Sequence, residues 1–109
     1  MTLAEACYRL SGDFPKAEVY GMTSQIRRAS VSIAANIAEG HGRESSGSFI
    51  QFLRVAQGSL KELETHLLLA SRIGLAKTVE INPLLKKSDE LGKMLRALIR
   101  SIQRRQADV

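Results

Sequence analysis

The residues of this chain best suited to chemistry are cations near its C-terminal end. Four of them recur at steps of three, four and four residues, so on a helix they would form one stripe: Lys93, Arg96, Arg100 and Arg104. Further cations extend this stripe, namely Lys86, Lys87 and Arg105, and two acids oppose it, Asp89 and Glu90. Such a face either keeps a helix soluble or contacts an anionic partner.

Few residues are available for catalysis or for binding a metal. Glu62 lies one helical turn before His66, so these two side chains can approach each other. A di-iron bundle needs Glu-x-x-His pairs on two helices together with further carboxylates, and this chain has a different spacing and only one such pair. Because it also lacks a serine nucleophile motif, we expect no catalytic residue, metal or cofactor, and therefore no enzyme.

Two other features have structural interpretations. Cys7 would lie on the apolar face of a first helix, where core packing explains it better than a reactive thiol. The run 40–43 (Gly-His-Gly-Arg) is glycine-rich like a phosphate-binding loop, but it follows no strand and lacks the Lys-Ser/Thr pair. We interpret it as a loop between helices, where Arg43 and the next helix N-terminus could hold at most one anion.

A polar row follows one face of the second expected helix. Its members fall at steps of three, four, four and three residues: Gln25, Arg28, Ser32, Asn36 and Glu39. Such a row either faces solvent or forms an internal hydrogen-bond network that fixes the register of the helices. Since no histidine accompanies it as an acid–base partner, we favour a structural network over an active site.

Composition points to one globular domain spanning residues 1–109. The net charge is +5 and the isoelectric point is about 9.8, which favours nucleic acid or an acidic surface as partner. Cys7 is the only cysteine, so an intrachain disulfide is excluded. The N-terminus has no signal-peptide pattern, and the longest apolar runs fall far below the roughly 20 residues of a membrane span. We therefore expect a cytoplasmic protein without a membrane segment.

The pattern of apolar residues is helical throughout. Glycines and prolines divide the chain into helices at about 2–11, 22–39, 46–73 and from 78 or 82 to 106. We expect Gly40 to end the second helix, and Asn82 and Pro83 are a plausible cap and first position for the fourth. Short connections between long helices imply antiparallel neighbours. The sequence thus predicts an all-α fold, an antiparallel up-down four-helix bundle.

The expected core leaves several apolar residues unused. The seams of the third helix are Phe49, Ala56, Leu63, Ala70 and Leu53, Leu60, Leu67, Gly74; those of the fourth are Leu84, Leu91, Leu98 and Ser88, Leu95, Ile102. Residues outside the seams are Phe52, Val55, Leu68, Leu69, Met94 and Ile99. Either the buried face is wider than these seams, or the residues form a subunit interface, which we favour.

Two sequence blocks resemble a known family. They read Asn-Ile-Ala-Glu-Gly at 36–40 and Gly-Ser-Leu-Lys-Glu-Leu-Glu-Thr at 58–65. Together with their surroundings they resemble the bacterial four-helix-bundle proteins encoded in intervening sequences of 23S rRNA genes, and the resemblance covers nearly the whole chain. It implies a ring-like homopentamer without enzymatic activity. Relatives include accessory subunits of diversity-generating retroelements, which bind a reverse transcriptase and nucleic acid.

Two functions remain open at this level. In the first, the oligomer binds RNA or single-stranded DNA without reading bases, through Lys86, Lys93, Arg96, Arg100, Arg104 and Arg105. The scarcity of aromatic residues favours phosphate contacts over base stacking. In the second, the chain is a protein–protein adaptor, for example for a reverse transcriptase, and the basic stripe is a solvated face or a dock for an acidic protein.

Overall fold

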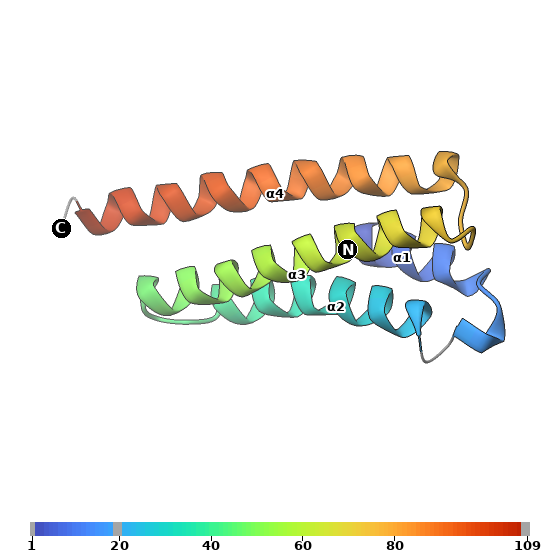
Figure 1. Ribbon diagram of the computed structural model, residues 1–109. Helices are drawn as coiled ribbons and strands as arrows, with labels where there is room; N and C mark the ends of the chain where they lie inside the picture. Colours follow the sequence, from blue (N-terminus) through green and yellow to red (C-terminus); the bar gives the residue numbers. More distant parts are fainter. Residues whose placement is uncertain (1, 19–20, 108–109) are drawn as a thin grey trace.

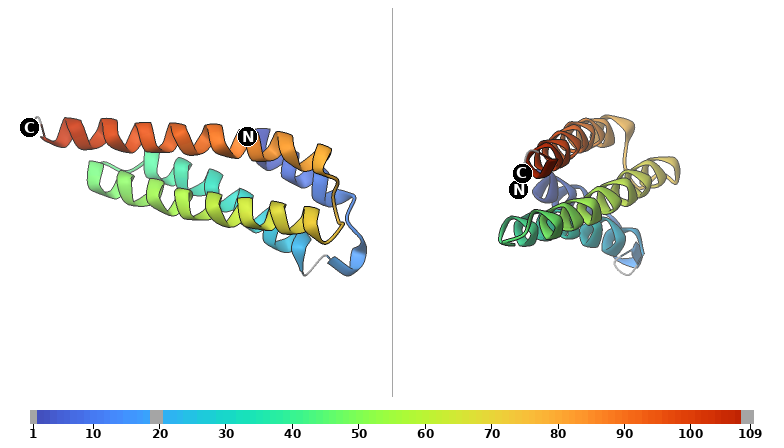
Figure 2. Two further views of the ribbon diagram at one scale, coloured as in Figure 1. Left: turned by 45° about the horizontal axis from the view of Figure 1, so that its top comes forward. Right: turned by 90° about the vertical axis from the view of Figure 1, so that its left-hand side faces the viewer.

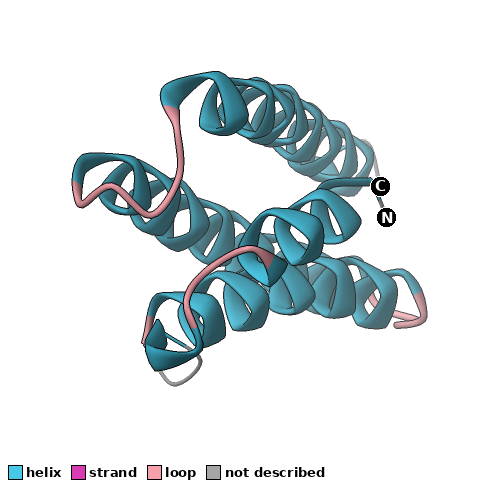
Figure 3. Ribbon diagram, turned by 90° about the vertical axis from the view of Figure 1, so that its right-hand side faces the viewer, coloured by secondary structure: helices cyan, strands magenta, loops and turns pink. Residues whose placement is uncertain are grey.

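The protein is a bundle of four α-helices. The computed structural model describes residues 2–18 and 21–107. The helices are α1 (Thr2–Gly12), α2 (Met22–His41), α3 (Ser46–Arg72) and α4 (Thr78–Ala107), and a short 3-10 helix η1 (Lys16–Glu18) joins the first two. Consecutive α-helices run in opposite directions, as the sequence predicts (Figure 1). Regular structure in the described ranges is helical throughout, without a strand (Figure 3).

The molecule is a rod of 53 × 23 × 18 Å. The helix pair α2–α3 forms its most extensive contact, and α4 packs on α3 and α1 but not on α2. Because α1 is short, it lies beside only one part of α4, and the C-terminal part of α4 extends past it along α3 (Figures 1 and 2). No helix within 2–18 or 21–107 is both long and apolar enough to cross a membrane.

The core follows the predicted apolar stripes. Side chains from all four α-helices are almost fully buried in it, among them Cys7, Ile26, Ile33, Leu53, Leu63, Leu67 and Ile81. Residues at steps of three and four on each helix face inward together, so one continuous core runs through the bundle. Of the residues outside the predicted seams, Ile99 is buried, which shows that the inward face of α4 is wider than two heptad positions.

Gly40 does not end α2, contrary to the sequence-based expectation. The helix continues to His41, and Gly42 follows it as the C-terminal cap. Gly40 is buried where α2 meets α3, and a Cβ built on it would lie 2.8 Å from Cβ of Phe52 and 3.0 Å from Cδ1 of Phe49. The glycine at position 40 therefore allows α2 and α3 to approach closely, whereas the sequence-based expectation was that it ends α2.

Of the two starts that the sequence leaves open for α4, the one near Thr78 is confirmed, and the one at Asn82 and Pro83 is wrong. The helix begins at Thr78, and Pro83 lies inside it. The backbone N–H of Lys77 donates a hydrogen bond to Oε1 of Glu80 at 3.0 Å, which is the return half of a capping box at the true N-terminus. The acid three residues after Lys77 was therefore the better start signal.

The third helix ends before its predicted last seam residue. Gly74 is exposed with φ of +82°, and it lies in the turn after α3. The N–H of Leu75 bonds to the carbonyl of Ala70 at 2.9 Å, and that of Gly74 bonds to the carbonyl of Ser71 at 3.2 Å. This pair of bonds is a Schellman motif, which requires a left-handed residue that glycine adopts without strain.

Candidate nucleic-acid interface

The basic stripe lies on an exposed flank of α4. Residues that recur at helical spacing bury the opposite side of this helix, namely Ile81, Leu84, Ser88, Gly92, Leu95, Ile99 and Ile102. The six cations predicted to bind nucleic acid are all exposed: Lys86, Lys93, Arg96, Arg100, Arg104 and Arg105. α4 thus has an apolar side and a charged side, because its sequence places apolar and basic residues at different angles around the helix axis.

Five of these cations share one side of α4, and Arg105 does not. Arg105 directly follows Arg104, so its side chain projects about 100° further round the helix; it donates to Oγ of Ser101 at 3.3 Å. Lys93 is paired with Asp89, whose Oδ2 lies 3.2 Å from its Nζ. The other four cations on this side, Lys86, Arg96, Arg100 and Arg104, have no ion pair among the described residues and are therefore the least neutralised part of the stripe.

An arginine from a neighbouring helix lies beside two arginines of the stripe. Arg54 of α3 lies with Arg96 and Arg100 around an open cleft of about 310 Å³ between α3 and α4. The other residues that line it are Gln57, Ile99 and Gln103, and so none of its described lining residues is acidic. Sequence reasoning missed Arg54, because the side-by-side placement of α3 and α4 brings it to the stripe.

A second cavity adjoins the arginine cleft. It measures about 240 Å³ and shares Gln57 and Arg96 with the first. Its other lining residues are Leu60, Lys61, Glu64, Ser88, Asp89 and Gly92. Ser88 is fully buried, and its hydroxyl has no hydrogen-bond partner among the described residues. The sequence pattern treats Ser88 as a core position on α4 and gives no reason for the hydroxyl.

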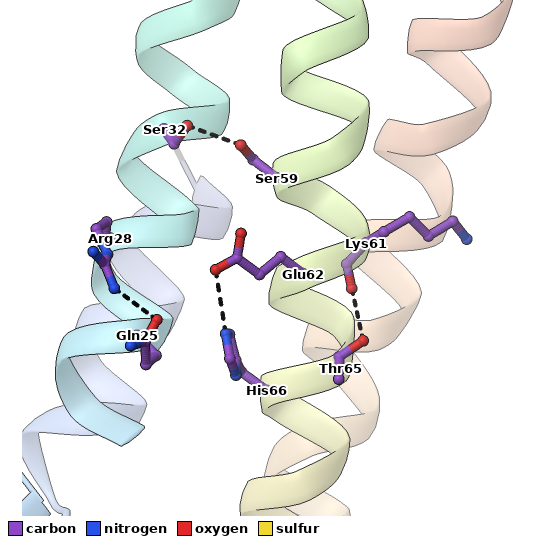
Figure 4. A network of polar contacts seen from close by, with 8 residues as sticks. All are labelled: Gln25, Arg28, Ser32, Ser59, Lys61, Glu62, Thr65 and His66. Carbon is purple, nitrogen blue, oxygen red and sulfur yellow. Dashed lines mark hydrogen bonds and ion pairs between the residues drawn. The ribbon is translucent and has the colours of Figure 1, made fainter. Parts of the chain in front are cut away.

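The polar row on α2 divides into local pairs. Nη2 of Arg28 donates to Oε1 of Gln25 at 2.8 Å, and Nη2 of Arg43 donates to Oε2 of Glu39 at 3.1 Å. The amide of Asn36 donates to the carbonyl of Ser32 at 2.8 Å. Among the described residues, the hydrogen bond from this row to another helix is that of Ser32, whose hydroxyl lies 2.8 Å from that of Ser59 on α3 (Figure 4). A role for the whole row in fixing helix register stays a prediction.

Glu62 and His66 lie beside this row on α3. Their Oε1 and Nε2 atoms are 3.4 Å apart, as the spacing predicts (Figure 4). In the described part of the chain, no third histidine, cysteine or acid joins them in a group that could hold a metal. Arg43 does not aim at a free anion site either, since it pairs with Glu39 and stacks over Phe52, with its guanidinium carbon 4.8 Å from the ring centroid.

The N-terminal helix is tied to α2 by an arginine that the sequence did not single out. Arg27 donates from Nε to the hydroxyl of Ser11 at 2.9 Å, and its guanidinium carbon lies 4.6 Å from the centre of the Tyr8 ring. Cys7 lies in the core nearby with no exposed surface. Burial raises the pKa of the Cys7 thiol to about 11, although the positive charge of Lys87 acts in the opposite direction.

The comparisons with known proteins concern the whole bundle. Residues 1–97 match the family described as 23S rRNA-intervening sequence protein. The chain belongs to this family. A solved structure, a protein of unknown function from the S23 ribosomal protein family of Bacteroides thetaiotaomicron at 1.70 Å resolution, superposes with a TM-score of 0.71. It is 24% identical over 89% of this chain and 97% of its own, so the likeness concerns the fold alone. No curated protein matches the chain.

Proposed function

We propose that this member of the 23S rRNA-intervening sequence protein family is a non-catalytic oligomer that binds RNA or single-stranded DNA through the phosphate backbone. The supporting observation is the convergence of Arg54, Arg96 and Arg100 from two helices on one open cleft. Guanidinium groups bind phosphate oxygens in a fixed, two-pronged geometry, and these three have no acidic partner among the described residues.

The composition of the cleft favours backbone contacts over base recognition. Aromatic residues make up 5% of the chain, and none of the described lining residues is aromatic. Without a stacking platform, most of the binding free energy comes from phosphate neutralisation and the release of counterions. Binding of this kind varies little with base sequence. Lys86, Lys93 and Arg104 extend the positive surface along α4, and Arg105 supplies a further cation on its other side.

Exposed apolar residues support self-association as part of the same proposal. Val55, Leu68, Leu69 and Met94 are 44–67% exposed, as a subunit interface would require. A homo-oligomer repeats the arginine cleft in each subunit, so weak single contacts sum to useful avidity. The number five rests on the family resemblance alone. Sedimentation equilibrium tests it: a mass near 12.0 kDa at micromolar concentration would refute the oligomer, and another multiple would refute only the number.

Charge reversal with a matched control tests the nucleic-acid proposal. We expect the combined variant Arg96→Glu, Arg100→Glu, Arg104→Glu to abolish binding in a low-salt filter assay, because it removes three phosphate contacts and adds repulsion. The control changes the net charge equally at exposed cations near the turns at the other end of the bundle: Lys16→Glu, Arg72→Glu, Lys77→Glu. Equal binding by both variants would mean that the cleft is only a solvated surface.

The alternative function is a protein–protein adaptor for a nucleic-acid enzyme such as a reverse transcriptase. The same exposed arginines could contact acidic side chains of such a protein. Capture from lysate with and without nuclease separates the two functions. A partner that stays bound after nuclease treatment, and that the charge-reversed variant loses, favours the adaptor.

A further inference from the structure

The unpaired hydroxyl of Ser88 lies beside the arginine cleft. Its residue lines the 240 Å³ cavity that shares Gln57 and Arg96 with the cleft of 310 Å³. A buried hydroxyl without a partner is unfavourable, because it has lost its hydrogen bonds to water. The two cavities together reach the size of roughly 300–1,000 Å³ that is usual for small-molecule sites. A bound group that both donates and accepts a hydrogen bond would complete this site.

The two cavities differ in the chemistry that they offer. The first has three arginines and suits a phosphate. The second contains Ser88 together with two acids, Glu64 and Asp89, and suits a hydroxyl group. Both acids already have a cation on their own helix, with Nζ of Lys61 3.4 Å from Glu64 and Nζ of Lys93 3.2 Å from Asp89. Each carboxylate therefore keeps free lone pairs that can accept a hydrogen bond from a neutral hydroxyl group. Because each is partly neutralised by its lysine, it repels the phosphates of a bound strand less strongly than an unpaired carboxylate would.

The second cavity exists partly because residue 92 has no side chain. Gly92 is buried in α4, and a Cβ built there would lie 3.4 Å from Cδ2 of Leu60 and 3.4 Å from Nη1 of Arg96. It therefore leaves room between the apolar floor formed by Leu60 and the guanidinium of Arg96. The neighbouring phosphate and hydroxyl groups of a sugar–phosphate chain would have space to lie across this point.

We propose that the two cavities hold one ribonucleotide unit of a single-stranded RNA, with its phosphate at Arg54, Arg96 and Arg100 and its ribose in the cavity at Ser88. The inference rests on the proposed nucleic-acid function and adds the preferred sugar to it. The Ser88 hydroxyl has almost no exposed surface in the free protein, so in this proposal its side chain turns into the cavity when RNA binds. The ribose 2′-hydroxyl is both donor and acceptor, so it then satisfies Ser88 in a way that deoxyribose cannot. The bundle then prefers RNA to DNA while it remains indifferent to the base.

Oligocytidylate strands of RNA and DNA with equal length test the sugar preference without changing the base. In a low-salt filter assay, we expect the wild-type protein to bind the RNA strand roughly fivefold more tightly, the effect of about one hydrogen bond. Ser88→Ala should bind both strands with the affinity that the wild type has for DNA. This variant removes a buried hydroxyl that makes no hydrogen bond to any described residue, so we expect it to fold normally.

The control is Ser101→Ala, on the same helix. The Ser101 hydroxyl accepts a hydrogen bond from Arg105, and Ser101 is not among the described residues that line either cavity, so this variant should keep the RNA preference. Equal wild-type affinity for both strands, or a preference that persists in Ser88→Ala, would overturn the inference. If an equal concentration of cytidine 5′-monophosphate displaced the RNA, the site would bind a free nucleotide, and the proposal that it holds one unit of an RNA strand would be overturned. If neither strand binds the wild type, the proposed function itself fails.

Discussion

Two glycines inside helices of this bundle lie in opposite packing environments. Gly40 of α2 is buried against Phe49 and Phe52, where a methyl group would have no space. Gly58 of α3 is exposed, and a Cβ built there would meet nothing within 4 Å. Both lie inside helices, where alanine is intrinsically more favourable by about 1 kcal/mol. Local packing therefore decides which replacement the protein tolerates.

We predict opposite effects of the same substitution at these two positions. Gly40→Ala should lower the free energy of unfolding by about 1–2 kcal/mol, because overpacking at the contact of α2 with α3 exceeds the gain in helix propensity. Gly58→Ala should raise it by about 1 kcal/mol. Urea denaturation followed by circular dichroism measures both. A Gly40→Ala protein as stable as Gly58→Ala would contradict the close helix approach.

The thiol of Cys7 provides a second prediction at the residue scale. Its pKa of about 11 in the folded protein exceeds the ordinary value of 9.0, since burial disfavours the thiolate. The unfolded chain therefore loses this proton at lower pH than the folded one, and the stability contributed by the neutral thiol falls as pH rises from about 9 to about 11. Cys7→Ala should show a smaller loss of stability over this window in urea titrations. An identical pH dependence would contradict the shift.

Helix ends show what the sequence of an element can and cannot indicate. The apolar spacing of α2, α3 and α4 predicted their existence and most of their buried residues, because burial on one side requires a helical period. Their ends depend on single hydrogen bonds. Asn82 and Pro83 look like a start, yet α4 begins four residues before Asn82, where Lys77 donates to Glu80. Local residue types alone do not reveal which of two competing caps forms.

This difference in caps predicts unequal effects of two alanine substitutions in the first turns of α4. Glu80→Ala should lower the free energy of unfolding by about 0.5–1 kcal/mol, because it removes the bond to the backbone of Lys77 and an acid near the helix N-terminus. Asn82→Ala should change it by less than about 0.5 kcal/mol, since Asn82 is an exposed residue within the helix. Thermal unfolding of the two variants compares them directly. A larger loss of unfolding free energy for Asn82→Ala than for Glu80→Ala would support Asn82 as the N-cap of α4.

The candidate site was only half visible in the sequence for a related reason. Lys93, Arg96, Arg100 and Arg104 follow from the period of one helix. Arg54 precedes Arg96 by 42 residues in the chain (96 − 54), and it joins them only because α3 packs beside α4. The unpaired state of Ser88 likewise depends on what surrounds it in three dimensions. The periodicity of a helix predicts which of its own residues share one side. A cleft between two helices can be predicted only when the relative positions of the two helices are known.

At the scale of the molecule, shape and charge act together. The bundle is a thin rod, and α4 continues beyond α1 (Figure 2). The cations on the C-terminal part of α4 are exposed. The net charge of +5 attracts a polyanion from a distance and speeds encounter at low ionic strength. Assembly into an oligomer would multiply this field and bring several arginine clefts to one strand. Salt should therefore control the affinity more strongly than base sequence does.

The salt dependence of binding is the most direct test of this account. Affinity of the wild-type protein for a single-stranded RNA should be measured by filter binding across a series of salt concentrations. With three or more phosphates neutralised per subunit, the logarithm of the association constant should fall with the logarithm of salt at a slope of about −2 or steeper, the same for different base sequences. Arg96→Glu, Arg100→Glu, Arg104→Glu should not bind at any salt concentration. A flat wild-type slope, or no wild-type binding at the lowest salt, would contradict the proposal that the arginine cleft binds phosphates.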